Sequence, residues 1–307
     1  MEVFTVFTQV LVLFILMMIG YIVRRLNIVD STFSKNLSNF LFAIILPAMI
    51  INSMNFPFSI KVLIDGGWLI IISMGVMLFS VIISMIAIKF FKVDILSENV
   101  YYFGLIFSNF SFMGFPVISA IYGQEGVLYT SIFILVIRIL FNTVGVAIMQ
   151  RGSGGKDKIQ LKNILNPPII AVFIGLTIFL FKIQIPKPIA MSLSMLSSAM
   201  TPLGMIVIGL ILANQKFTQM FSDVKVYIAS FIRLIFIPVC LLIPLKMLGF
   251  DSLIVGVPVI VTAMPMAATA SILAEKYNGN SYLGAQCMFV SSLLSIITIP
   301  LIVFLVI

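Results

Sequence analysis

Residues Phe107–Tyr122 read FSNFSFMGFPVISAIY and lie inside an apolar segment that is long enough to cross a lipid bilayer. The stretch carries Asn109, Ser111, Gly114 and Pro116 near its middle. A proline inside a helix removes a backbone hydrogen-bond donor and clashes with the preceding turn, and a nearby glycine loosens the same place. We therefore predict a transmembrane helix that is broken at Pro116.

A second stretch of the same kind lies late in the chain, where VIVTAMPMAATAS surrounds Pro265. Unwound backbone inside a bilayer must line a cavity or be buried in protein, because amide and carbonyl groups that face lipid cost several kcal/mol each. If the two broken helices cross, the half-helices that begin near Pro116 and Pro265 point their N-termini at the crossing. Such ends carry unsatisfied N–H groups and partial positive charge, which suits a carboxylate. The alternative is a pair of ordinary proline kinks without a binding site.

The composition is that of an integral membrane protein. Of the 307 residues 62% are hydrophobic and only 9% are charged, against roughly 25% charged residues in soluble domains. The net charge of +8 comes without a basic run interleaved with polar or aromatic residues, so no nucleic-acid partner is expected. The chain has no histidine, and its two cysteines fall in apolar spans, so neither a metal site nor a disulfide framework is indicated.

Ten apolar segments are predicted to span the membrane. The N-terminal segment lacks the basic region of a signal peptide and is expected to be a retained first span. With the N-terminus outside, twelve of the 18 basic residues lie on the cytoplasmic side and four on the other, as the positive-inside rule requires. Both termini are then outside a cell membrane that the chain crosses many times. The segments are 3–23, 36–54, 67–89, 100–121, 127–149, 168–182, 189–213, 226–247, 252–274 and 282–306.

The predicted fold is an all-α polytopic membrane protein with ten transmembrane helices in two inverted five-helix repeats. The expected units are residues 1–150, a cytoplasmic loop at 151–163, and residues 164–307. An odd number of spans in each half makes the two halves insert in opposite directions. The order of the prolines supports this, since Pro47 and Pro116 in the first half match Pro202 and Pro265 in the second.

Arg138 lies eleven residues into the fifth predicted span, close to the bilayer midplane. Inserting an arginine there costs roughly 2.5–3.5 kcal/mol, so it needs a partner. All ten acidic residues are expected in loops or at span ends, which leaves carbonyl groups of the broken helices or an anionic substrate. Asn142 is one turn further on the same face. An arginine that only holds carbonyl ends together is the alternative. Arg233 lies closer to a span end and is expected to extend to the membrane surface.

Several polar side chains flank the two breaks. By their spacing Asn109, Phe112 and Pro116 share a helix face, with Ser111 beside it. Hydrogen-bond donors here suit a carboxylate, and Phe112 suits an apolar body. The alternative is that they satisfy backbone groups freed by proline or mend helix contacts; we favour function for Asn109 and the alternative for each Ser or Thr alone. The candidate substrate-binding residues are Asn109, Ser111, Phe112, Gly114, Pro116, Arg138, Asn142, Thr262, Pro265 and Thr269.

With these stretches the sequence resembles the auxin efflux carrier family, which includes plant auxin exporters and bacterial permeases proposed for malate, malonate and related acids. The resemblance implies ten helices in two inverted repeats and a scaffold formed by the first, second, sixth and seventh helices. It also implies crossing fourth and ninth helices, elevator-like alternation, and an organic-anion site beside the crossing, where Asn109, Pro116 and Pro265 correspond by position. The motifs are LSNFLFAIILPAMI (Leu37–Ile50), SNFSFMGFPV (Ser108–Val117), TPLGMIVIGLIL (Thr201–Leu212), RLIFIP (Arg233–Pro238) and AMPMAATASILAEKYNGN (Ala263–Asn280).

The sequence therefore favours a secondary carrier that moves a small organic anion, a carboxylate, across the cytoplasmic membrane without a cofactor. A proton- or sodium-coupled symporter of the same fold is the nearest alternative, although the acidic sodium ligands of the related bile-acid transporters have no counterpart at mid-depth here. A membrane receptor or scaffold that moves nothing is another alternative, and a homodimer is left open. An enzyme is not expected, because no histidine, cysteine pair or mid-depth carboxylate supplies acid–base or metal chemistry.

Overall fold

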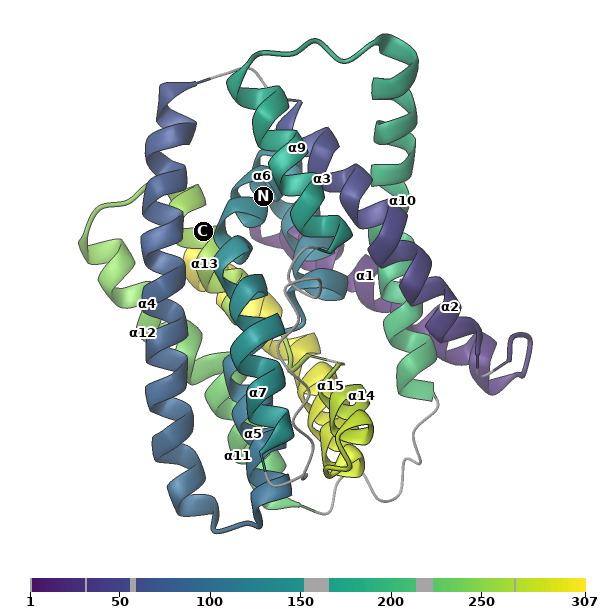
Figure 1. The fold of residues 1–307 in the computed structure, drawn as a ribbon, viewed down its shortest axis with the longest axis vertical. Helices are drawn as coiled ribbons and strands as arrows, with labels where there is room; N and C mark the ends of the chain where they lie inside the picture. Colours follow the sequence, from purple (N-terminus) through teal and green to yellow (C-terminus); the bar gives the residue numbers. More distant parts are fainter. Residues whose placement is uncertain (1, 31, 56–58, 152–165, 214–222, 268) are drawn as a thin grey trace. The chain divides into compact units, whose positions relative to one another are not determined.

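The protein is described from a computed structural model, which describes residues 2–30, 32–55, 59–151, 166–213, 223–267 and 269–307. Within these ranges the chain forms helices and no named strand (Figure 1). Those labelled η are π-helices. The helices are α1 Glu2–Arg25, α2 Phe33–Phe40, η1 Leu41–Ile45, α3 Leu46–Met54, α4 Ile60–Phe91, α5 Ile95–Ile106, η2 Phe110–Gly114, α6 Phe115–Leu140, η3 Phe141–Gly145, α7 Val146–Gln150, α9 Pro167–Leu180, α10 Lys187–Ala213, α11 Val224–Phe231, η5 Ile232–Phe236, α12 Ile237–Met247, α13 Ser252–Thr262, α14 Thr269–Lys276 and α15 Ser281–Val306.

Among the described residues, six helical segments are long and apolar enough to cross a membrane. Two shorter apolar helices, Pro167–Leu180 and Ser252–Thr262, accompany them. The prediction of an all-helical polytopic membrane protein is confirmed at this level. The ten-helix inverted repeat stays a prediction, and the predicted loop at 151–163 lies, beyond Arg151, outside the described residues. The six segments are Phe33–Met54, Ile60–Phe91, Phe110–Gln150, Lys187–Ala213, Val224–Met247 and Ser281–Val306.

A proline follows three of the four π-helices in the described chain. The π-helices η1, η2 and η5 each end two residues before a proline, at Pro47, Pro116 and Pro238 respectively. A proline ring cannot donate a backbone hydrogen bond and clashes with the carbonyl four residues earlier, and a widened turn accommodates both defects. In η3, which has no following proline, Asn142 Nδ2 donates instead to Arg138 O at 2.9 Å.

The segment labelled α6 consists of two helices that meet at Gly123. This residue has φ 62° and ψ −148°, a conformation that glycine adopts at little cost. The second half of the fourth predicted span therefore ends just before Gly123. The fifth predicted span then begins after it and continues through η3 into α7.

The described chain falls into two compact units that interleave along the sequence. Unit 1 contains α1, α2, η1, α3, α9, α10 and the first part of α6. Its α1, α2–η1–α3, α9 and α10 are the four spans that the resemblance implies for a scaffold. Within this unit α1 packs closely on α10, since a Cβ at Gly209 would collide with the backbone at Met17 and Tyr21. Small residues at such contacts allow helix backbones to approach.

Unit 2 contains most of α4 together with α5, the end of α6, α7, α11, η5, α12, α13, α14 and α15. Helix α15 contacts α5, α11, α13 and α14, and α14 runs beside it (Figure 1). At one end of α5, Asp94 accepts hydrogen bonds from the N–H groups of Leu96 and Ser97, which caps the helix. The Tyr101 hydroxyl donates to Asp223 Oδ2 at 3.1 Å and so joins α5 to the start of α11.

Candidate functional site

The two predicted broken helices meet at their breaks, and the meeting point lies entirely inside unit 2. Helix α5 ends at Ile106 and helical structure resumes at Phe110, while α13 ends at Thr262 and α14 begins at Thr269. In the two breaks Asn109 N donates to Pro265 O at 2.8 Å. Ala267 N donates to Phe107 O at 3.2 Å, and Ser108 pairs with Met266 in an antiparallel bridge. The unwound segments therefore satisfy each other's backbone groups, as apolar surroundings demand.

The prediction that the earlier helix breaks at Pro116 is wrong in its position. The break is at residues 107–109, and Pro116 lies in the first turn of α6, after η2. A proline is tolerated in a first helical turn, and the widened turn before it removes the clash. Pro265 does lie within its break, between Thr262 and Thr269.

Asn109 is the candidate residue whose side chain most clearly has an unsatisfied hydrogen-bond donor. Its side chain is 4% exposed, and its Nδ2 has no hydrogen-bond partner among the described residues. A buried donor without a partner costs about 1–3 kcal/mol. Asn109 lies in extended backbone before η2, so the prediction that it shares a helix face with Phe112 is wrong. On the opposite break, the buried Thr269 Oγ1 also has no partner in the described part of the chain.

Four candidates on the fourth span lie in unit 1. Ser111 and Phe112 are half-buried, and Gly114 and Pro116 are buried. Pro116 cannot supply the N–H that would bond the carbonyl of Phe112, and this oxygen lies where a Cβ added at Gly204 would meet it at 3.2 Å. Phe112 and Pro116 therefore pack against α10 at Gly204 within unit 1, and contact of any of the four residues with a ligand stays a prediction.

Thr262 and Asn142 use their side chains within their own helices. Thr262 Oγ1 donates to Pro258 O at 2.5 Å, and Asn142 Nδ2 donates to Arg138 O at 2.9 Å. Both are hydrogen bonds to the carbonyl four residues earlier, which polar side chains commonly make in membrane helices. For a ligand, Thr262 Oγ1 then has only its acceptor lone pairs, whereas Asn142 keeps its Oδ1 and the second N–H of its Nδ2.

Arg138 is buried, with 4% of its side chain exposed. Its guanidinium carbon is 5.1 Å from the ring centroid of Phe110, which follows Asn109 directly. This is a cation–π contact, worth about 2 kcal/mol when it is desolvated. The contact places a positive charge close to the second half of the fourth span.

Arg233 has a role that the sequence suggested for Arg138, since it is bonded to carbonyl ends of the broken helices. It is 2% exposed and donates through its Nη1 to Leu105 O at 2.9 Å and to Ile106 O at 3.3 Å. A longer contact of 3.5 Å joins Nε to Met264 O. The expectation that Arg233 extends to the membrane surface is therefore wrong. The position of Arg233 in its own helix could not show this burial, because the carbonyl partners are distant in sequence: Met264 is 31 residues away and Leu105 is 128 residues away.

Asp65 lies close to the start of a long helix. The predicted span began at 67, whereas α4 begins at Ile60, so Asp65 lies in the second turn of α4. Asp65 is 6% exposed and accepts a hydrogen bond of 2.6 Å from the Tyr129 hydroxyl, within unit 1. Its depth in the membrane stays a prediction. In the described part of the chain, no group of three or more His, Cys, Asp or Glu could hold a metal ion.

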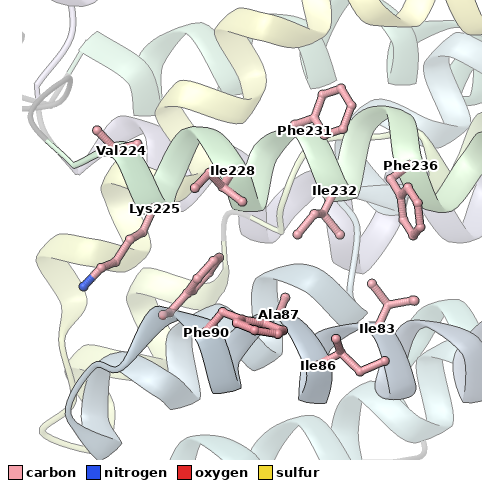
Figure 2. Close-up of a pocket in the computed structure, with 11 residues that line it drawn as sticks. Ile83, Ile86, Ala87, Phe90, Val224, Lys225, Ile228, Phe231, Ile232 and Phe236 are labelled. Atoms are coloured by element: carbon pink, nitrogen blue, oxygen red, sulfur yellow. The ribbon is translucent and has the colours of Figure 1, made fainter.

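A cavity of about 770 Å³ lies elsewhere in unit 2, between the second half of α4 and the α11–η5 segment (Figure 2). Its lining is aliphatic and aromatic except for Lys225, which Figure 2 shows beside Val224 at one end of the row of side chains. A carboxylate needs several convergent donors, which this lining does not offer. The cavity is therefore a poor candidate for an anion site, in contrast to the crossing.

Comparison with known proteins gives one family and several relatives. Residues 5–303 match the family described as membrane transport protein. An uncharacterized transporter of Methanocaldococcus jannaschii is 26% identical over 302 residues, which cover 95% of this chain and 96% of the relative. An uncharacterized transporter of Methanothermobacter thermautotrophicus is 30% identical over 194 residues, 63% of each chain. The uncharacterized transporter YfdV of Escherichia coli is 26% identical over 200 residues, 62% of each chain. The resemblance to the auxin efflux carrier family is thereby confirmed.

Proposed function

The chain belongs to the membrane transport protein family, and we propose that it is a secondary carrier that moves a small organic anion, a carboxylate, across the cytoplasmic membrane. The observation that carries the substrate class is the Asn109 amide. Its Nδ2 is a buried donor without a partner among the described residues, at the place where two broken apolar helices pair. A carboxylate oxygen would supply the missing acceptor.

The charges near the crossing also favour an anion. Helical structure begins again at Phe110 and at Thr269, and the first N–H groups of a helix lack partners within it and carry partial positive charge. Arg138 adds a guanidinium against the Phe110 ring, one residue from Asn109. The only acidic side chain that is buried in the described chain, Asp65, belongs to the other unit.

The division into two compact units supports alternating access of the elevator type. Both breaks, with Asn109 and Pro265, belong to unit 2, and the backbone passes between the units within α4 and α6 and at the start of η2. Rigid-body movement of unit 2 would carry the crossing without disturbing the hydrogen bonds that join its two breaks. Membrane potential alone could drive an anion outward, at about 2.3 kcal/mol per charge per 100 mV.

Uptake into proteoliposomes tests the proposal. Labelled mono- and dicarboxylates would be supplied to vesicles that contain the wild type, Asn109→Ala, or Asn39→Ala as a matched control at an exposed asparagine of α2. We expect saturable flux of at least one acid in the wild type and in Asn39→Ala, and a loss of about tenfold or more in Asn109→Ala. Binding of an acid without any flux would favour the receptor alternative, and equal flux in all three proteins would refute the site.

A proton-coupled carrier is the second candidate, because Asp65 is a buried carboxylate inside a membrane-length helix. A carboxylate in such a place can take up and release a proton during a transport cycle. Uptake driven by an imposed pH gradient would be lost in Asp65→Asn if this residue couples the proton, while exchange of substrate across the membrane without a gradient would continue. If pH-driven accumulation is absent in the wild type, this candidate fails.

A further inference from the structure

The guanidinium of Arg233 lies where two helix ends come together. It donates to Leu105 O and Ile106 O, which are the last carbonyl groups of α5, and makes a longer contact with Met264 O, just after α13. The side chain is 2% exposed. The proline-linked π-helix η5 places Arg233 at this point, since the widened turn Ile232–Phe236 comes two residues before Pro238.

The charges at this place balance. The C-terminal end of a helix carries about −0.5 elementary charge, because its last carbonyl groups have no partner within the helix. Helices α5 and α13 both end at the crossing, so together they contribute about one negative charge. Arg233 brings one positive charge and remains protonated at neutral pH. No charge is then left over on the C-terminal side of the crossing.

Backbone carbonyls at the C-terminal ends of broken helices are the groups that coordinate a coupling cation in many secondary transporters. We propose that Arg233 is a resident cation that replaces such an ion, so that the crossing holds its geometry and binds its anion without sodium or any other inorganic cation. The part about the anion rests on the proposed function. The part about geometry does not, and it can be tested on the protein without substrate.

Lysine would be a poor substitute. The planar guanidinium directs several donors at fixed angles and reaches carbonyls of two helices at once, whereas an ammonium group is a single point charge on a flexible stem. A neutral, short side chain would leave three carbonyl oxygens facing an unfilled space of negative potential. Such a space is suited to a monovalent cation, which takes oxygen ligands.

The test compares ion dependence in the purified full chain. Melting temperature would be measured in sodium chloride, in choline chloride and in choline chloride with added methylguanidinium, for the wild type, Arg233→Ala and Arg233→Lys. We expect the wild type to melt at the same temperature in all three. Arg233→Ala should melt lower in choline and regain about 2–4 °C or more with sodium or methylguanidinium, because a ligand that binds only the native state raises its stability.

Arg138→Ala is the matched control, since Arg138 is the other buried arginine of unit 2 and lies against the Phe110 ring. Its melting temperature should not respond to sodium. Labelled carboxylate binding to the wild type should likewise be equal in sodium and choline. The inference is overturned if the wild type needs sodium for stability or binding, or if Arg233→Ala behaves as the wild type in choline. It is also overturned if Arg233→Ala folds but no small cation raises its melting temperature.

If Arg233→Ala cannot be purified, Arg233→Gln keeps a donor without the charge and takes its place in the same measurements. The ion independence of the wild type is measured in either case. Failure of every carboxylate to bind would count against the proposed function and would leave the melting data to decide on Arg233.

Discussion

Replacing Asn109 by alanine should move stability and affinity in opposite directions. In the free protein the Nδ2 of Asn109 is buried and has no partner among the described residues. Removing such a donor relieves about 1–3 kcal/mol, which offsets the small cavity that the shorter side chain leaves. The melting temperature of Asn109→Ala should therefore stay the same or rise.

In the complex the same amide is expected to donate to a carboxylate oxygen. A hydrogen bond to a charged group contributes about 1.5–3 kcal/mol, and each 1.4 kcal/mol is a factor of ten in affinity. The Kd of the carboxylate should then rise by about 10- to 150-fold in Asn109→Ala. Isothermal titration of the detergent-solubilised protein measures the Kd, and differential scanning calorimetry measures the stability.

Asn280 is the control, because both polar atoms of its side chain have partners: Nδ2 donates to Ser97 Oγ at 3.0 Å, and Oδ1 accepts from the N–H of Leu283 at 3.0 Å. Asn280→Ala should lower stability by about 1 kcal/mol and leave the Kd unchanged. The reasoning is refuted if Asn109→Ala is destabilised as Asn280→Ala is, while its affinity for the carboxylate does not change. Asn109 would then be a structural residue of the crossing.

Three further predictions concern stability. Gly209→Ala should lower the free energy of unfolding by about 1–3 kcal/mol, because the new Cβ collides with the backbone of α1. Gly75→Ala in α4 is the control, because its Cβ meets nothing within 4 Å. In thermal unfolding this variant should be neutral or stabilised by up to about 1 kcal/mol. Hydrogen bonds from Ser97 and from the N–H of Leu96 lower the pKa of Asp94 below its ordinary value of 3.8. The stabilisation by the Asp94 carboxylate should therefore be present above about pH 4 and be lost as the pH falls below that. Asp94→Ala should be about 1 kcal/mol less stable at pH 7, and its acid unfolding curve should lack the loss of stability below about pH 4. Tyr129→Phe removes the donor to the buried Asp65 carboxylate and should lower stability by about 1.5–3 kcal/mol in thermal unfolding.

The sequence was sufficient to place two broken helices but not to locate the first break. The polar residues and the single proline in each of 107–122 and 259–271 indicate that a regular helix does not continue there. The earlier break nevertheless falls at 107–109, because those residues pair with Pro265 and Ala267 across more than 150 positions of sequence. The helix propensities of neighbouring residues cannot predict a pairing between segments so far apart in sequence. A π-helix ends two residues before Pro47, Pro116 and Pro238, but Pro202, Pro244, Pro258 and Pro300 lie inside α-helices without one, so a proline alone does not predict the widened turn.

The two arginines show what spacing along a helix can and cannot decide. Distance from the span ends predicted that Arg138 lies near the bilayer midplane and needs a partner, and in the structure this residue is 4% exposed. The same argument allowed Arg233 to extend to the membrane surface, although it is 2% exposed. Burial of an arginine depends on the carbonyl groups that surround it, and those of Arg233 come from α5 and from the end of α13. Depth in a single helix is therefore a weak guide whenever another helix ends at the same level.

The hydrogen bonds at the crossing are the basis of our proposal that an anion, rather than a cation, binds there. Four helix ends meet at the two breaks: α5 and α13 end there, and η2 and α14 begin there. The guanidinium of Arg233 donates to carbonyls at both C-terminal ends, so these ends have their compensating charge inside the protein. The beginnings of η2 and α14 carry partial positive charge, and beside them the Nδ2 of Asn109 has no acceptor in the described chain. Because the C-terminal ends already have a compensating positive charge, we propose that the ion bound at the crossing is negative.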